Sequence, residues 1–148
     1  MEELLEKMRK YCAYQERSIL EVREKLKPST LPQDKIDIII QRLVNDDFIN
    51  EERFTECFVR GKFKTKQWGK NKIRQHLFLK GIDATTANKH LSSDIDENEY
   101  FEVLKAQIDK YIKTIDASTE NGLAKLFRHF TSKGYEYDNI KKALKAEN

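Results

Sequence analysis

The sequence has few of the residues that build β turns, disulfides or membrane spans. Its 148 residues include five glycines and two prolines, too few for the many tight turns of an all-β protein. Cys12 and Cys57 have no cysteine or histidine nearby at metal-ligand spacing, and two thiols in a lysine-rich chain indicate a reducing compartment. No apolar run approaches the roughly 18 residues of a membrane span. Residues 1–12 are charged throughout, unlike a signal peptide. We therefore expect a cytoplasmic protein.

The composition that remains is that of a folded protein with much solvated surface. Hydrophobic residues make up 39% of the chain and charged residues 36%, so a single large core is not expected. Eight Phe, six Tyr and one Trp supply much of the apolar volume, which excludes a disordered chain. Such a balance is typical of a helical protein with several small cores.

Apolar residues recur with a helical period along almost the whole chain. Ser18 and Glu21 have the spacing of a capping box, and Asn50 is placed to cap another helix. The apolar seam from Phe101 to Ile115 predicts a long helix in the second half of the chain. No stretch shows the alternation of a half-buried strand.

One pattern of five apolar positions, separated by 4, 5, 5 and 4 residues, occurs three times. Two copies have Lys-Gly before the third position, where Gly81 and Gly134 fit a left-handed residue that closes a helix. Each copy therefore predicts a helix, a tight turn and a second helix. The copies are Val22, Leu26, Leu31, Ile36 and Ile40, then Ile73, Leu77, Ile82, Ala87 and Leu91, then Leu126, Phe130, Tyr135, Ile140 and Leu144.

These repeats are too small to bury their own apolar faces, so neighbours must stack. We predict an all-α fold, an elongated tandem array of three-helix repeats with about nine helices. Residues 1–66 would form the first repeat with an N-terminal helix and a linking helix. Residues 67–116 would form the second three-helix repeat, and residues 117–148 the C-terminal helical repeat.

The positive charge is concentrated in a basic segment, residues 57–82, which contains eight Lys or Arg and no acidic residue. The whole chain carries +3, so the other residues sum to −5. Cationic residues interleaved with aromatics are typical of a surface for nucleic acid or an acidic protein. A solvated helix face is the alternative, with Trp68 as a packing anchor rather than a base-stacking residue. The candidate binding residues are Arg60, Lys62, Lys64, Lys66, Trp68, Lys70, Lys72 and Arg74.

No motif of enzymatic or metal chemistry is present. Gly61-Lys62 and Gly69-Lys70 lack the spacing and the following Ser or Thr of a phosphate-binding loop. His76 and His129 occupy the same repeat position, which favours a structural role. We expect no catalytic residue, no metal and no cofactor, and a hydrolase or transferase with a dispersed site is the least favoured hypothesis.

The chain resembles the RecX family of RecA recombinase regulators. The most specific block is residues 43–54, LVNDDFINEERF, and it continues through residues 58–63 to Trp68-Gly69. Residues 14–18 resemble the start of the family's sequences, and residues 127–135 with Ile140 resemble its last repeat. The resemblance covers nearly the whole chain and implies a string of three-helix repeats.

The resemblance also implies a function. RecX proteins bind the RecA–DNA filament, lie along its groove and inhibit ATP hydrolysis and strand exchange, and some bind DNA themselves. The expected partners are thus a RecA filament and single- or double-stranded DNA, with the chain as a monomer. A helical DNA-binding module without a recombinase partner is the alternative. The acidic residues 94–99 are a departure from the expected cationic contact surface. They are typical of a helix N-terminus, and the alternative is that they repel phosphate locally.

Overall fold

Helices account for nearly all of the regular structure. The computed structural model describes residues 1–146, and within them the chain forms nine α-helices and no strand, which confirms the predicted all-α class. A short 3-10 turn, Lys27–Ser29, follows the second helix, and a π-helical segment, Lys62–Lys66, extends the fourth. The α-helices are α1 (Glu2–Tyr14), α2 (Ile19–Leu26), α3 (Gln33–Asn45), α4 (Glu51–Gly61), α5 (Lys70–Leu79), α6 (Ala84–Ser93), α7 (Glu97–Ile112), α8 (Glu120–Ser132) and α9 (Tyr137–Lys145).

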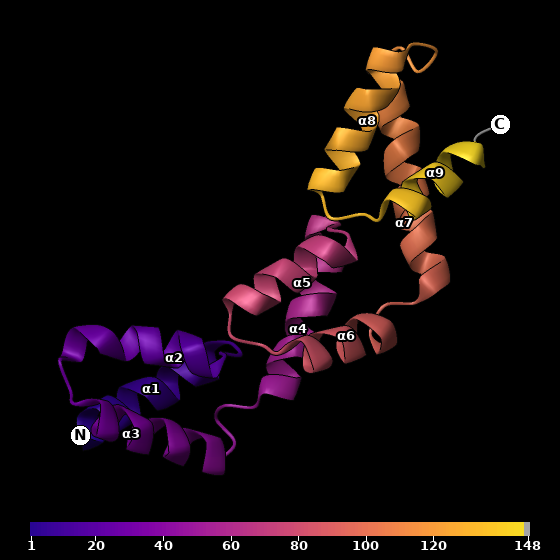
Figure 1. Ribbon diagram of the computed structural model, residues 1–148. Helices are drawn as coiled ribbons and strands as arrows, with labels where there is room; N and C mark the ends of the chain where they lie inside the picture. The colour runs from indigo at the N-terminus through magenta and orange to yellow at the C-terminus, as the bar shows by residue number, and fades with distance from the viewer. Residues whose placement is uncertain (147–148) are drawn as a thin grey trace.

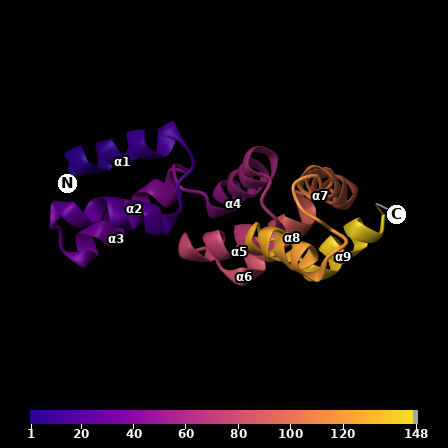
Figure 2. The ribbon, with the colours of Figure 1, turned by 90° about the horizontal axis from the view of Figure 1, so that it is seen from above.

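The helices pack in three consecutive groups of three, α1–α3, α4–α6 and α7–α9. Figures 1 and 2 show these groups following one another along an elongated body, with the two termini at opposite ends. The unit boundaries predicted from the sequence differ from these packing groups. They placed α4 in the first unit, residues 1–66, as a linking helix, and they placed α7 in the second unit, residues 67–116. The packing groups α4 with α5 and α6, and α7 with α8 and α9. The last two residues of the range 117–148 lie outside the described part of the chain.

Two separate hydrophobic cores stabilise the array. The first lies within α1–α3 and ends at Ile49. The second begins at Phe54 and runs through α4–α9, so the middle and C-terminal groups share one core. At roughly 25 cal/mol per Å² of apolar surface buried, these cores supply the main folding free energy. The first group therefore has a core of its own, whereas the other two depend on each other.

The predicted repeat positions form much of both cores. Thirteen of the fifteen apolar residues in the three copies are buried, and only Leu31 and Leu144 are half-buried. Gly81 and Gly134 have φ angles of 81° and 101°, the left-handed conformation expected after the first helix of each copy. The long helix α7 ends at Ile112, short of the predicted Ile115.

Helix starts in the first half follow the predicted caps. The Ser18 hydroxyl accepts from the Glu21 N–H at 3.2 Å, and the Glu21 carboxylate accepts from the Ser18 N–H at 3.0 Å, which completes the capping box. The Asn50 side chain accepts from the Arg53 N–H at 3.0 Å and fixes the start of α4. These caps set the entry angles of α2 and α4, the two helices on either side of the connection between the cores.

Candidate functional site

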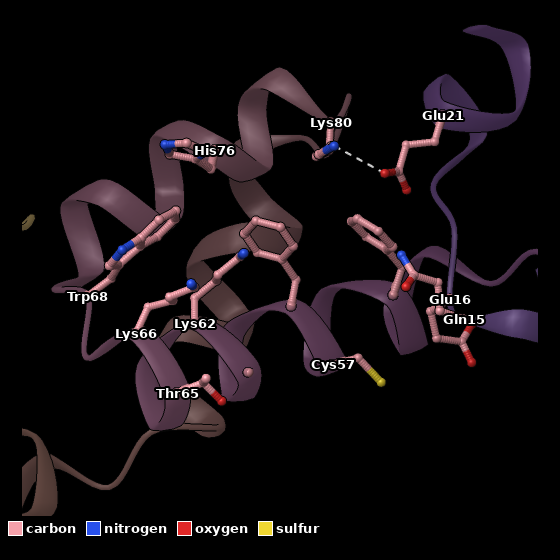
Figure 3. A pocket seen from close by; sticks show the side chains of 13 residues that line it. Gln15, Glu16, Glu21, Cys57, Lys62, Thr65, Lys66, Trp68, His76 and Lys80 are labelled. Carbon is pink, nitrogen blue, oxygen red and sulfur yellow. Dashed lines mark hydrogen bonds and ion pairs between the residues drawn. The ribbon is translucent and has the colours of Figure 1, made fainter. Parts of the chain in front are cut away.

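A groove runs between the first group of helices and the α4–α5 pair. It has a volume of about 620 Å³, and we call it the Trp68 groove. Figure 3 shows Trp68 and Lys66 at one end and Glu16 and Glu21 at the other. Its lining residues are Gln15, Glu16, Glu21, Phe54, Cys57, Phe58, Gly61, Lys62, Thr65, Lys66, Trp68, His76 and Lys80.

The loop that carries Trp68 is held on both sides. The π-helical segment ends at Gln67 with a left-handed φ of 56°, and the Trp68 N–H donates to the Lys62 carbonyl at 3.2 Å. On the other side, the Gly69 N–H donates to the Lys133 carbonyl at 2.8 Å. The half-buried indole also packs against the larger core. The packing-anchor interpretation of Trp68 therefore agrees with its contacts.

Three side chains surround the indole of Trp68. The Lys72 Nζ lies 4.5 Å and the Lys62 Nζ 5.1 Å from the ring centroid, within the range of cation–π attraction. The His76 ring lies 4.5 Å away at an angle of 48°. Burial and the nearby lysines, Lys72 first, lower the pKa of His76, so its imidazole is neutral at pH 7. The positive charge beside the indole therefore comes from the lysines.

The eight predicted binding residues separate into two sets. Four of them have partners within the protein. Arg60 pairs with Glu56 at 3.2 Å, Lys64 with Glu99 at 2.6 Å and Lys70 with Glu97. The Arg74 guanidinium donates to the Asn71 and Asn88 side chains, both at 2.8 Å.

Lys62, Lys66 and Lys72 make no ion pair with a carboxylate in residues 1–146. Lys66 is exposed, and the other two are half-buried beside Trp68. Because no internal counterion neutralises them, they remain available to an external anion. The structure thus gathers Lys62, Lys66 and Trp68 at one end of the groove, with Lys72 over the Trp68 ring, and directs Arg60, Lys64, Lys70 and Arg74 toward other groups.

The acidic residues 94–99 account for part of this division. The Asp96 side chain caps α7 by accepting from the Glu99 N–H at 2.9 Å, as expected for a helix N-terminus. In the first turn of α7, Glu97 pairs with Lys70 and Glu99 pairs with Lys64. The acidic turn therefore neutralises a part of the basic segment.

Two residues that contact Trp68 or the loop that carries it were not among the predicted set. His76 follows Lys72 by four residues on α5, so the helical period could have placed it on the same face. Lys133, in the α8–α9 turn, accepts from the Gly69 N–H through its carbonyl, and burial, followed by the charge of Lys72, lowers the pKa of its side chain. No local sequence signal places Lys133 there, because its position depends on how the third group packs on the Trp68 loop.

Comparison with known proteins identifies the family. The family model of the RecX second three-helix domain matches residues 50–91, which span α4 to α6. The regulatory protein RecX of Clostridium botulinum is 34% identical over 128 residues, which are 84% of this chain and 59% of that protein. The chain belongs to the RecX family. RecX of Clostridium perfringens is 30% identical over 80% of this chain and 56% of its own length. The chain spans about half the length of these curated relatives.

Solved RecX structures have the same fold. The crystal structure of RecX from Lactobacillus salivarius superposes with a TM-score of 0.84 at 26% identity, covering 99% of this chain and 97% of that one. A second structure, of regulatory protein RecX, gives a TM-score of 0.86 at 23% identity over 97% of this chain. The array of three-helix units predicted from the sequence is confirmed, and RecX is a regulatory family rather than a family of enzymes.

Among the described residues, no helix is long and apolar enough to cross a membrane. In the same part of the chain, no three His, Cys, Asp or Glu side chains are grouped so that they could hold a metal ion. Both findings concern residues 1–146 alone.

Proposed function

We propose that this RecX-family chain binds RecA recombinase on DNA and mainly inhibits its ATPase and strand-exchange activity. The observation that carries the proposal is the set of lysines around Trp68, which have no internal counterion and lie on an elongated body of the RecX fold. Cationic side chains of this kind bind DNA phosphates or the acidic surface of a protein. In this role the chain acts as a monomer in the cytoplasm, in recombination and DNA repair.

The shape of the molecule supports binding to a filament. Three helix groups in a row present repeated faces over a length that can span neighbouring subunits of a polymer (Figure 1). Once one site is bound, the linked sites are held at a high effective concentration next to theirs, so several weak contacts together give a high overall affinity. A body attached across adjacent subunits would oppose the movements that accompany ATP turnover.

Within the predicted contact surface, we propose that Lys62, Lys66 and Lys72 make the direct contacts. Arg60, Lys64, Lys70 and Arg74 would contribute to the surrounding field, because their partners within the protein already use much of their charge. Reversing the charge of Lys64 or Lys70 would also break an ion pair of the fold. A clean test must therefore change the unpaired lysines.

The test is DNA-dependent ATP hydrolysis by the cognate recombinase while this protein is titrated in. We expect inhibition at substoichiometric ratios by the native chain and its loss in the variant Lys62→Glu/Lys72→Glu. The matched control is Lys141→Glu/Lys142→Glu, the same change of charge on exposed residues of α9 at the far end of the array. No inhibition by the native chain would contradict the proposal.

The alternative function, DNA binding without a recombinase partner, has a separate outcome. Its test compares the affinity of the chain for naked single-stranded DNA with its affinity for recombinase-coated DNA. Preference for the coated form is expected of a filament regulator. Preference for naked DNA, with no effect on ATP hydrolysis, would favour the DNA-binding module.

A further inference from the structure

The two helices α5 and α6 border a surface hollow of about 570 Å³, which we call the α5–α6 hollow. The charged residue of its lining is Arg74, and the apolar ones are Phe78, Leu79, Ile82, Ala84 and Ala87. We propose that this hollow binds an acidic amphipathic helix of a partner protein, with apolar side chains inside it and a carboxylate on Arg74. The inference goes beyond the proposed function and does not depend on it.

The α5–α6 hollow and the Trp68 groove use different faces of α5. His76 and Lys80, which are four residues apart, line the groove (Figure 3). Arg74 and Phe78, also four residues apart, line the hollow. Residues four apart share a helix face, whereas residues two apart point away from each other. The hollow is therefore a second surface, separate from the groove.

Two adjacent large apolar side chains at the hollow are open to solvent. Phe78 is 76% exposed and Leu79 is 66% exposed. At the equivalent positions, the first copy of the repeat has Lys27-Pro28 and the third has Thr131-Ser132. The packing of a copy therefore does not require apolar side chains here. Adjacent exposed apolar residues beside an apolar hollow are typical of a surface that binds another protein.

The repeat also shows that the charge of Arg74 lacks a carboxylate that a neighbouring copy provides. The Arg74 Nε donates to the Asn88 Oδ1 at 2.8 Å. In the first copy the equivalent residues are Arg23 and Asp37, and they form an ion pair at 2.8 Å. The second copy keeps this contact between its two helices but has an uncharged amide in place of the carboxylate. An external carboxylate can therefore supply the missing charge.

The Arg74 guanidinium is held in position for such a contact. Its Nη1 donates to the Asn71 side chain at 2.8 Å, and neither this bond nor the bond to Asn88 involves Nη2. Asp83, between two lining residues in sequence, caps α6 by accepting from the Thr86 N–H at 2.8 Å. A guanidinium that is already fixed loses little side-chain entropy when it binds a carboxylate, and its planar fork suits that group.

A small residue opens the space between the two helices. Ala84 is equivalent to Gln33 in the first copy and to Tyr137 in the third. In the third copy the Tyr137 ring lies 4.9 Å from the ring of Phe127, which is the equivalent of Arg74. An aromatic pair thus occupies the place that Ala84 leaves open in the second copy. The resulting volume of about 570 Å³ is typical of a ligand pocket.

These features favour a protein helix over a nucleic acid. An amphipathic helix places apolar anchors about one turn apart into a groove, and an acidic residue beside them would reach Arg74. The phosphates of a nucleic acid need several cations, whereas the lining of the hollow is mainly apolar and contributes Arg74. Only the helix uses both the apolar surface and the guanidinium.

The first experiment titrates the isotope-labelled full chain with three synthetic amphipathic peptides and follows the amide signals by NMR. The peptides share two leucines one helical turn apart and differ in one neighbouring residue, which is Glu, Gln or Lys. We expect the Glu peptide to bind about tenfold or more tightly than the Lys peptide, with the Gln peptide between them. The shifted amides should lie in α5 and α6. No binding, equal affinities, or shifts confined to the residues around Trp68 would overturn the assignment.

The second experiment repeats the titration with variants. Phe78→Ser should weaken the Glu peptide about tenfold or more, because it removes apolar contact surface. Arg74→Gln should make the affinities for the Glu and Gln peptides equal. Tyr14→Ser is the matched control, since Tyr14 is an exposed aromatic residue on α1, and it should bind like the native chain. Thermal unfolding checks each fold, and Leu79→Ser replaces Phe78→Ser if that variant does not fold. Equal binding by the serine variants would contradict the proposal.

A different occupant would give a different result. Sedimentation velocity of the chain alone should show a monomer. A dimer that Phe78→Ser dissociates would mean that the hollow joins two copies of this chain, and this would overturn the assignment to a partner protein. The peptide titration contains neither recombinase nor DNA, so a failure of the proposed function would leave its outcome unchanged.

Discussion

Gly69 and Gly134 lie with their backbones in direct contact, where the loop before α5 meets the turn between α8 and α9. A Cβ at Gly69 would lie 2.3 Å from the Gly134 carbonyl carbon, and one at Gly134 would lie 2.4 Å from the Lys72 Cβ. The Asn71 N–H also donates to the Gly134 carbonyl at 2.9 Å. Because these distances leave no room for a side chain, two glycines allow the third helix group to hold the loop that carries Trp68.

Gly134→Ala should therefore destabilise the protein by about 2–5 kcal/mol, from the left-handed φ and the steric overlap together. Urea denaturation measures the loss. Gly61→Ala is the matched control, because a Cβ there meets no atom within 4 Å and Gly61 ends α4 in a helical conformation. That substitution should leave stability unchanged or raise it by up to about 1 kcal/mol. Equal effects of the two substitutions would contradict the close contact.

His90 predicts a dependence of stability on pH. Its buried ring lies between two carboxylates, with Nε2 2.5 Å from Glu52 and Nδ1 2.7 Å from Asp94. Burial lowers the pKa of His90, but the hydrogen bonds to Glu52 and Asp94 outweigh it and raise the pKa above its ordinary value of 6.5. A raised pKa in the folded state gives stability that is fully present below pH 6.5 and is lost as the pH rises through the folded value.

The measurement is the free energy of unfolding of the native chain minus that of His90→Gln, from pH 5.5 to pH 9. Subtraction is needed because the pKa values of His76 and His129 are lowered, chiefly by burial, and these groups contribute with the opposite sign. We expect the difference to be largest at the acidic end and to shrink as the pH rises. A difference that grows with pH would contradict the pairing of a charged His90 with both carboxylates.

Local signals in the sequence were enough to predict the elements of the fold. The capping box of Ser18, the cap of Asn50 and the left-handed Gly81 and Gly134 depend on neighbouring residues alone, and all four are confirmed. The spacing of apolar residues also predicted the positions that are buried, because the three copies share one helical geometry. The repeats predicted an elongated array, and the family resemblance agreed with it in implying a string of three-helix units.

The grouping of helices and the composition of the site depend on tertiary contacts. The sequence shows that Lys64 and Lys70 are cationic, but it does not show that Glu99 and Glu97 neutralise them from a helix that begins some thirty residues later. Nor does it show that the Lys133 carbonyl accepts from the Gly69 N–H, where the third helix group meets the Trp68 loop. Counting charges along the chain therefore predicted a uniform basic segment. In the folded protein, the lysines without an internal carboxylate partner are Lys62 and Lys66, which line one end of the groove, and Lys72, which lies over the Trp68 ring.

The connection between the two cores predicts a specific weak point. Arg53 on α4 pairs with Glu16 at 2.6 Å and with Asp47 at 3.1 Å. Glu51 accepts from the Ile19 N–H at 2.9 Å. These contacts are polar and partly exposed, so each contributes little, about 1 kcal/mol. Arg53→Met removes both pairs and should therefore lower overall stability by about 1–2 kcal/mol, while proteolytic cleavage near residues 46–50 becomes faster. Arg60→Met on the same helix removes only the pair with Glu56 and should change neither quantity.

Leu26 and Leu77 are equivalent in the repeat and equally buried, yet they belong to different cores. Truncation of either to alanine should cost about 2–5 kcal/mol locally. The consequences differ because Leu26 supports α1–α3 alone, whereas Leu77 lies in the core that α4–α9 share. Hydrogen exchange should show Leu26→Ala lowering protection in α1–α3 only, and Leu77→Ala lowering it from α4 through α9. A uniform loss of protection in both variants would mean that the polar contacts of Glu16, Glu21 and Glu51 couple the two cores into one cooperative unit.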